Sequence, residues 1–161
     1  MSNILVAYFS ATGTTKRAAK GLAEALGADT FEIVPQTPYT STDLNWSDST
    51  SRSTSEMNDE ASRPPISGTV DDMDSYDAVF VGFPIWWYTE PRIIDTFLES
   101  YDFSGKTIVP FATSGGSGLG KAPERMQRIA TGSTVAAGRL LNGHQNPNDL
   151  RDWAQRLGLM R

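Results

Sequence analysis

The sequence predicts an α/β protein built on a doubly wound, five-stranded parallel sheet with the strand order 2-1-3-4-5. Short apolar runs rich in β-branched and aromatic residues alternate with segments whose apolar residues recur at helical spacing, which is typical of parallel α/β sheets. The first run, residues 4–9, is apolar throughout, as expected of a strand buried on both faces. Right-handed crossovers and short connections favour this order, which places a ligand site outside the carboxyl ends of the first and third strands.

Each further strand and helix has its own pattern. Apolar runs predict strands at residues 30–34, 78–83, 107–112 and 135–141. One-sided apolar spacing predicts helices at residues 16–26, 91–101, 122–131 and 148–157, and a short helical turn is expected at 71–76. The last strand has the weakest pattern, because Gly138 and Arg139 interrupt its run.

Length and composition bound the class of protein. We expect one domain, residues 1–161, around one core. No apolar run approaches the length of a membrane span. We expect no signal peptide, because a strand is predicted close to the N-terminus. The sequence has no cysteine, which excludes disulfides and thiolate chemistry and suits a reducing compartment. We expect a cytoplasmic protein without a membrane partner, as a monomer or weak dimer.

The net charge of −5 is unevenly distributed. Residues 29–78 carry 11 of the 19 acids against two arginines, so this segment is −9 and the rest of the chain is +4. This balance argues against nucleic acid as a partner, because its phosphates would be repelled. We favour a solvated acidic face as the interpretation. The alternative is a field that attracts a basic protein partner and mainly raises the association rate.

A long polar connection, residues 36–68, follows the predicted second strand. It is rich in serine, threonine, aspartate and proline, and a structureless connection of this length is unusual within a compact domain. We expect it to contain a short helix at 56–61. The large apolar side chains that could fix it to the body are Tyr39, Leu44 and Trp46. The segment either packs on the surface or forms a lid, for which Trp46 and Arg63 are the candidate contacts.

A loop of small and hydroxylic residues follows the first strand: Ser10-Ala11-Thr12-Gly13-Thr14-Thr15. The first N–H groups of the next helix lack partners within it, and the helix dipole adds partial positive charge there. Gly13 permits a close backbone approach or a positive φ. Strand, loop and helix together therefore predict a phosphate site; the alternative is that Thr12 or Thr14 merely caps the helix. The spacing matches neither G-x-x-x-x-G-K-[ST] nor G-x-G-x-x-G.

Two further unusual loops follow the third and fourth predicted strands. Their sequences are Pro84-Ile85-Trp86-Trp87-Tyr88 and Thr113-Ser114-Gly115-Gly116-Ser117-Gly118. Three adjacent aromatic rings cannot all point inward, so we expect at least one to be exposed or to cover a planar ligand; core packing is the alternative for any single ring. The glycine-rich loop offers bare backbone N–H groups to a ligand, and the alternative is a plain flexible turn.

These loops together resemble the flavodoxin family. The pattern S-x-T-G-x-T is similar to the loop with which flavodoxins hold the phosphate of flavin mononucleotide (FMN). PIWWY and PFATSGGSG resemble a bacterial flavodoxin-like subgroup in which the two loops wrap the isoalloxazine ring. The pattern covers residues 3–153. The resemblance implies a flavodoxin-like fold and FMN as the cofactor.

The resemblance also implies the contacts. The phosphate would be held by Ser10, Thr12, Gly13, Thr14 and Thr15. The ring would be contacted by Pro84, Ile85, Trp86, Trp87, Tyr88, Thr113, Ser114, Gly115, Gly116 and Gly118. We predict Trp87 as the ring that stacks on the flavin. The chain departs from its relatives at Tyr88, where they commonly carry a small residue, and this speaks against a peptide flip there on flavin reduction.

As a function, the resemblance implies an FMN protein that shuttles electrons between redox partner proteins. An acidic, aromatic-lined site without a cation near the phosphate should disfavour the anionic reduced flavin and so lower its potential. One alternative is an NAD(P)H-dependent quinone or azo reductase on the same fold, although the dinucleotide fingerprint is missing. Another is a non-redox module for a different phosphorylated ligand.

The remaining polar residues have plain interpretations. His144, the only histidine, lies in a polar turn and is predicted to be at the surface, and a site with paired histidines is excluded. Asp71 and Asp72 lie on a solvated turn and are not candidates for acid–base chemistry. Arg125 and Arg128 are expected to point from their helix toward solvent.

Overall fold

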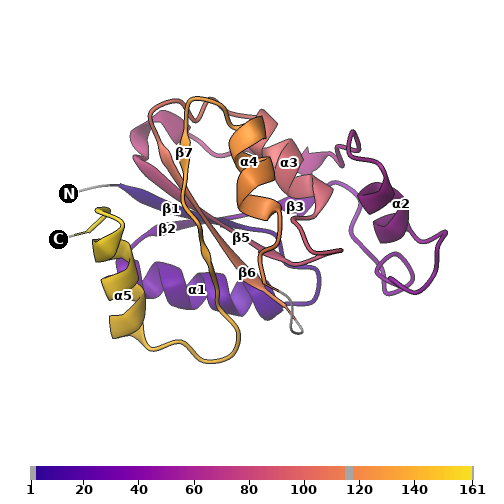
Figure 1. Ribbon diagram of the computed structural model, residues 1–161, viewed down its shortest axis with the longest axis horizontal. Helices are drawn as coiled ribbons and strands as arrows, with labels where there is room; N and C mark the ends of the chain where they lie inside the picture. The colour runs from indigo at the N-terminus through magenta and orange to yellow at the C-terminus, as the bar shows by residue number, and fades with distance from the viewer. Residues whose placement is uncertain (1–2, 115–117, 161) are drawn as a thin grey trace.

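The computed structural model describes residues 3–114 and 118–160 and shows a sheet with helices on both faces (Figure 1). The strands of the sheet are β1 (Ile4–Tyr8), β2 (Asp29–Glu32), β5 (Ala78–Pro84), β6 (Thr107–Thr113), β7 (Thr134–Val135) and β8 (Arg139–Leu140). The helices that cover it are α1 (Thr14–Leu26), α3 (Arg92–Glu99), α4 (Ala122–Ile129) and α5 (Pro147–Arg156). The predicted turn at 71–76 contains the 3-10 helix Met73–Ser75.

The order of the main strands is β2-β1-β5-β6-β7, and all their pairings are parallel. Strands β3 (Val34–Pro35) and β4 (Ile66–Ser67) lie outside this sheet and pair with each other. Counted without them, the order is the predicted 2-1-3-4-5, so the predicted fold class is confirmed. Strands β5 and β6 stay in register up to Pro84 and Thr113, so the loops that follow them begin at the same level.

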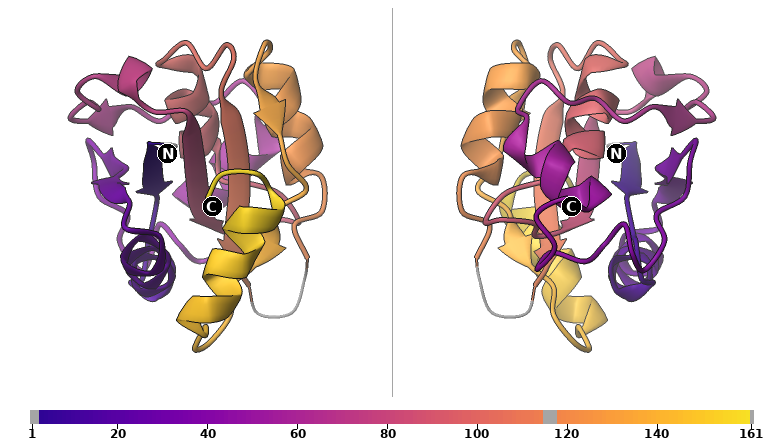
Figure 2. Two further views of the ribbon diagram at one scale, coloured as in Figure 1. Left: turned by 90° about the vertical axis from the view of Figure 1, so that its left-hand side faces the viewer. Right: turned by 90° about the vertical axis from the view of Figure 1, so that its right-hand side faces the viewer.

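Each face of the sheet carries its own apolar core. Successive residues of a strand point to opposite faces, and in β1 Leu5 and Ala7 join the core under α3 and α4. Val6 and Tyr8 join the core under α1 and α5. The helices α1 and α5 therefore form one layer and α3 and α4 the other (Figures 1 and 2). Both faces being covered explains why the strands are continuously apolar.

The predicted fifth strand, 135–141, is divided into β7 and β8, which both pair with β6. Gly138 lies between them at a φ of +79°. A Cβ at this glycine would lie 2.4 Å from the carbonyl oxygen of Pro110. The backbone thus passes too close to β6 for a side chain, and the predicted interruption at Gly138 has a steric cause.

The long connection follows β3 and contains the helix α2 (Arg52–Asn58) and β4. The helix begins four residues before the predicted start of 56–61. Its N-cap is Ser51, whose Oγ accepts a hydrogen bond from the N–H of Thr54 at 3.3 Å. The second strand ends at Glu32 because the chain then turns away and Val34 pairs with Ser67. No helix in the described part of the chain is long and apolar enough to cross a membrane.

Candidate functional site

A cavity of about 850 Å³ lies where β1, β5 and β6 end. It is bounded by the three loops that the sequence singles out and by the long connection. Its lining residues are Ala11, Thr12, Thr14, Thr15, Leu44, Trp46, Ser53, Pro84, Ile85, Trp86, Trp87, Tyr88, Thr113, Ser114 and Asn142. None of these described residues is charged, so the cavity presents hydroxyl, amide, backbone, aliphatic and aromatic groups.

The first loop leads into α1 without a side-chain cap. The N-cap residue is Gly13, at a φ of +95°, and no side chain of the described residues caps the helix. Neither Thr12 nor Thr14 therefore plays the capping role of the alternative interpretation. The N–H of Gly13 donates to Oγ of Ser10 at 3.0 Å, so Ser10 shapes the loop. The N–H groups of the first helical turn stay available to a ligand.

A buried pair of hydroxyls connects the first and third loops. Thr15 and Thr113 are 1% and 5% exposed, and their Oγ1 atoms lie 2.8 Å apart. Since β5 lies between β1 and β6, this bond links the helix that follows β1 to the end of β6. It fixes the start of the third loop relative to the first turn of α1.

The second loop is a tight turn with unusual backbone angles. The N–H and carbonyl of Trp86 exchange hydrogen bonds of 3.1 Å with those of Thr89. The two residues between them, Trp87 and Tyr88, have φ of +49° and +65°. Two positive φ angles in a two-residue turn are the geometry that Asn-Gly normally adopts. Left-handed angles cost an ordinary residue about 1–2 kcal/mol, so the backbone of this turn is strained and the surrounding contacts must maintain it.

The three aromatic rings of the turn have different surroundings. Trp86 is half-buried and makes edge contacts with Phe9 and Tyr39, at centroid distances of 5.7 and 5.5 Å. Trp87 and Tyr88 are 39% and 72% exposed. Core packing therefore describes Trp86 only in part, because it also lines the cavity. Trp87 lines the cavity with an exposed ring, and its stacking on a ligand stays a prediction.

A buried ionic cluster begins at Glu90, directly after the turn. Glu90 and Asp95 are fully buried. Nε of Arg125 lies 3.2 Å from Oε2 of Glu90, and its Nη2 lies 3.2 Å from Oδ2 of Asp95. The expectation that Arg125 points to solvent is therefore wrong, whereas Arg128 is exposed. The pattern of α4 could not reveal this, because the two acids lie 35 and 30 residues earlier in the chain.

The cluster also perturbs a protonation equilibrium. Burial, together with the hydrogen bond and charge of Glu90, raises the pKa of Asp95 to about 8, although the charges of Arg125 and Arg63 lower it. The hydroxyl of Thr89 donates to Glu90. The strained turn is thus followed directly by Glu90, whose side chain is fixed by burial and by its ion pair with Arg125.

The two lid candidates of the long connection have different positions. Trp46 lines the cavity and is 76% exposed. Nε of Arg63 lies 3.0 Å from Oε2 of Glu99, and its Nη1 donates to the carbonyl of Glu60. Arg63 is not among the residues that line the cavity. Of the two, only Trp46 is placed to touch a ligand there.

Most of the predicted site residues meet at the cavity. Those that line it are Thr12, Thr14, Thr15, Pro84, Ile85, Trp86, Trp87, Tyr88, Thr113 and Ser114. Ser10, Gly13 and Gly118 are described but do not line it, and Gly115 and Gly116 lie outside the described residues.

Sequence reasoning missed several lining residues. These are Ala11, Leu44, Ser53 and Asn142, of which Leu44 is predicted only as an anchor. Oδ1 of Asn142 accepts a hydrogen bond from the N–H of Ser114 at 2.9 Å and so holds the start of the third loop. No motif marks Asn142, which belongs to a different connection 28 residues away.

Solved structures of other proteins are similar to this chain in fold. A candidate flavoprotein from Bacteroides eggerthii DSM 20697 is 47% identical, with a TM-score of 0.93 over 98% of this chain and 99% of that chain. A second, from Bacteroides uniformis ATCC 8492, is 48% identical, with a TM-score of 0.89 over 96% and 98%. A flavoprotein from Lactobacillus acidophilus NCFM, crystallised in complex with FMN, is 20% identical with a TM-score of 0.75 over 96% and 99%, and so shares the fold.

No curated protein sequence matches the chain significantly. Residues 3–157 match the sequence profile of a family described as Flavodoxin. The profile spans all the strands and helices of the sheet, and the predicted resemblance is confirmed. The chain therefore belongs to the flavodoxin family.

Proposed function

We propose that this protein binds FMN and carries electrons between redox partner proteins. The observation that carries the proposal is the shared cavity: the start of α1, the aromatic turn and the loop after β6 all border one space. FMN has an anionic phosphate and a planar ring system, and the cavity offers a matching group to each. The FMN complex from L. acidophilus and an FMN-bound flavodoxin from Fusobacterium nucleatum share this fold.

The start of α1 suits the phosphate. The helix has no side-chain cap and no acid in its first turn, so its N–H groups and dipole favour an anion. Thr12 and Thr14, on either side of the N-cap Gly13, line the cavity and add hydroxyl donors. The site would therefore hold a dianion without a buried cation.

The aromatic turn suits a planar ring. Its three aromatic side chains and Ile85 line the cavity, and the volume of the whole cavity lies within the range of about 300–1,000 Å³ that is usual for ligand sites. When bound, the flavin supplies one- and two-electron chemistry. The residues of this chain would hold its ring, limit its contact with water and set the charge of its surroundings.

The test of cofactor binding is the absorbance spectrum of the purified protein with and without added FMN. We expect a bound flavin spectrum. Thr12→Glu places a negative charge beside the phosphate and should weaken FMN binding at least about tenfold, while riboflavin, which has no phosphate, should bind as before. A protein that stays colourless in the presence of FMN would support the non-redox alternative.

A second measurement separates the carrier from the NAD(P)H-dependent quinone or azo reductase. We expect the flavin-loaded protein alone to oxidise NADPH no faster than free FMN does in the presence of a quinone. Turnover by the purified protein alone would decide for the reductase. The proposed setting is the cytoplasm, and we expect size-exclusion chromatography to show a monomer or weak dimer.

A further inference from the structure

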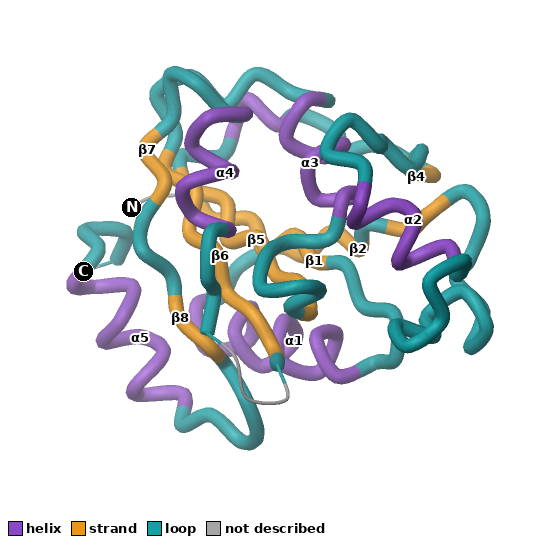
Figure 3. The backbone as a smooth tube through the Cα atoms, turned by 45° about the vertical axis from the view of Figure 1, so that its right-hand side comes forward, coloured by secondary structure: helices purple, strands orange, loops and turns teal. Residues whose placement is uncertain are grey.

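One side of the cavity comes from the long connection between β3 and β4. Leu44, Trp46 and Ser53 line the cavity from this segment, and we call these three residues the outer wall. Figure 3 shows the connection with α2 beyond the end of the sheet, on the side where the three loops leave β1, β5 and β6.

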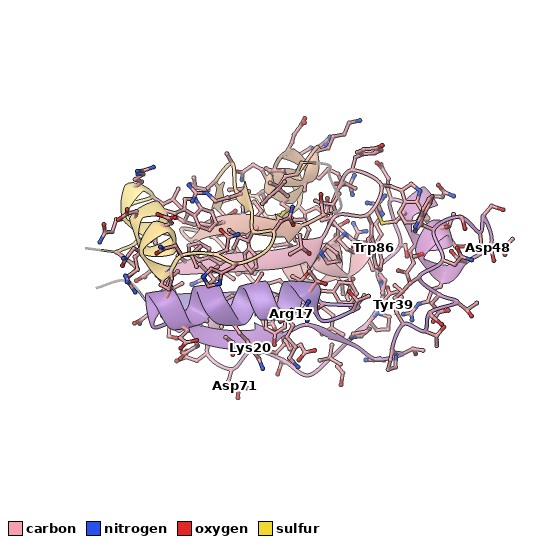
Figure 4. The ribbon with its side chains drawn as sticks, turned by 90° about the horizontal axis from the view of Figure 1, so that it is seen from below. Arg17, Lys20, Tyr39, Asp48, Asp71 and Trp86 are labelled. Carbon is pink, nitrogen blue, oxygen red and sulfur yellow. The ribbon has the colours of Figure 1, made fainter. Side chains whose placement is uncertain are left out.

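The outer wall is fixed to the body of the protein through Tyr39. The ring of Tyr39 packs edge-on against Phe9 at 5.6 Å and against Trp86 at 5.5 Å. Its hydroxyl donates to Oε1 of Glu56 at 2.5 Å, and the guanidinium of Arg52 lies 3.8 Å from the ring centroid. Figure 4 shows Tyr39 and Trp86 at one end of the molecule, with Asp48 farther out. The segment is thus tied directly to the aromatic turn.

A second attachment comes from α3. Arg92 is 3% exposed, and its guanidinium donates to backbone carbonyls at the end of α2. The acceptors are the oxygens of Glu56 at 3.3 Å, Met57 at 2.8 Å and Asp59 at 3.2 Å. A buried arginine that donates to three carbonyls at the C-terminal end of the helix fixes the end of α2. The connection is therefore an ordered segment that forms a fixed side of the cavity.

Trp46 lies in a closed turn of this wall. The N–H of Asp48 donates to the carbonyl of Asn45 at 3.2 Å, and the hydroxyl of Ser47 donates to Oδ1 of Asn45 at 2.7 Å. Despite this order, the Trp46 side chain is 76% exposed. Tryptophan is a large apolar residue that is usually well buried. A fixed, exposed tryptophan on a cavity wall is suited to cover a ligand.

We propose that Trp46 is a further cofactor-binding residue, whose indole covers the planar ring that the turn at Trp86–Tyr88 holds from the other side. This rests on the proposed function. Among the described lining residues, Trp46 is the only aromatic one outside the turn, and Thr113 and Ser114 offer no ring. A flavin in the cavity would therefore lie between aromatic groups only if Trp46 supplies the second.

The test compares Trp46→Ala and Trp46→Phe with the wild-type protein. Dissociation constants are measured for FMN and for riboflavin, together with quenching of the bound flavin by iodide. Trp46→Ala should raise both dissociation constants about 5- to 10-fold and increase quenching. Trp46→Phe should stay within about twofold, because it keeps a ring. The control is Val34→Ala, another exposed apolar residue outside the cavity, which should change nothing.

The outcomes separate the inference from the proposed function. The melting temperature of the apoprotein should be unchanged in Trp46→Ala, because the side chain is exposed. Unchanged dissociation constants for both ligands overturn the inference, as does a loss confined to FMN, which would indicate an effect through the phosphate. Normal flavin binding with slower electron transfer to a partner overturns it in favour of a docking role. A wild-type protein that binds no flavin refutes the proposed function itself.

Discussion

Trp87 and Tyr88 adopt positive φ angles, which residues other than glycine and asparagine rarely adopt. Such strain persists only where the surroundings enforce it, and it is concentrated at functional sites. Here the enforcing contacts are the two hydrogen bonds between Trp86 and Thr89 and the buried Glu90 that follows. The strain is therefore consistent with a turn shaped for a ligand at the expense of stability.

The first prediction concerns this strain. Tyr88→Gly should raise the free energy of unfolding of the apoprotein by about 1 kcal/mol relative to Tyr88→Ala, because only glycine accepts the positive φ without cost. The side chain is 72% exposed, so both substitutions remove little burial. Urea denaturation measures the difference. Equal stabilities of the two variants would show that the turn is relaxed.

A second prediction concerns the glycine that supports the turn. A Cβ at Gly120 would lie 2.0 Å from the carbonyl oxygen of Tyr88, whereas nothing lies within 4 Å of one at Gly143. Both glycines have positive φ, so Gly143→Ala is a matched control for backbone strain. Gly120→Ala should cost about 1–3 kcal/mol more in unfolding free energy and also weaken FMN binding. An equal cost at both positions would contradict the close approach.

Backbone angles could be predicted from the sequence only where the residue type itself favours the conformation, as glycine does. A positive φ is one of the two uses expected of Gly13 between strand and helix, and it is present. The left-handed angles of Trp87 and Tyr88 could not be predicted, because their residue types favour the opposite conformation. The hydrogen bonds between Trp86 and Thr89 and the buried Glu90 that follows hold these angles against the preference of both residue types.

At the scale of the elements, α3 and α4 are held together by buried charges. Arg125 pairs with Glu90 and Asp95, and Arg92 lies 3.8 Å from Asp95. Buried ion pairs add little net stability, but removal of one partner leaves a charge without compensation. Arg125→Met should therefore lower the unfolding free energy by about 3–5 kcal/mol. Arg128→Met, one helical turn farther along and exposed, should stay within about 0.5 kcal/mol, and similar losses for both would argue against the cluster.

The same cluster predicts a dependence of stability on pH. The pKa of Asp95 is about 8 in the fold against an ordinary value of 3.8, so the folded protein retains a proton that the unfolded chain loses. The stabilisation from this group is fully present below about pH 4 and is lost as the pH rises through about 8. Asp95→Asn should reduce the fall in unfolding free energy between pH 5 and pH 8. Glu99→Gln, at an exposed acid, should not, and the same fall in all three proteins would exclude Asp95.

The long connection shows what element patterns cannot supply. Its helix was predictable in kind but not in position, since Ser51 was one of many possible caps in a serine- and threonine-rich segment. Its attachment depends on Arg92 and Tyr39, which are far apart in sequence from their partners. The side of the cavity formed by Leu44 and Ser53 therefore becomes visible only in three dimensions.

For the whole molecule, the sheet order was predictable because alternating strands and helices leave few topologies. The place of the cavity followed from that order, since three distinctive loops had to meet at one end of the sheet. The field at that site is also a property of the whole chain, which has a net charge of −5, and no described residue lining the cavity is cationic.

This field predicts the redox behaviour. We expect the reduction potential of the bound flavin to lie below that of free FMN, because the surroundings disfavour added negative charge. Thr12→Lys should raise the potential by placing a cation at the phosphate end. Titration of the loaded protein with a dye of known potential measures both effects. A potential at or above that of free FMN would contradict the prediction.

The N-cap of α1 is a glycine, and no described side chain caps its first turn. An anion bound there would accept hydrogen bonds from the free N–H groups of the first turn, so folding and ligand binding would be linked equilibria. At a concentration one hundred times its dissociation constant, such a ligand adds about 2.7 kcal/mol to the stability of the native state. The lifetime of the folded chain in a cell would then depend on the supply of the nucleotide as well as on the amino acids.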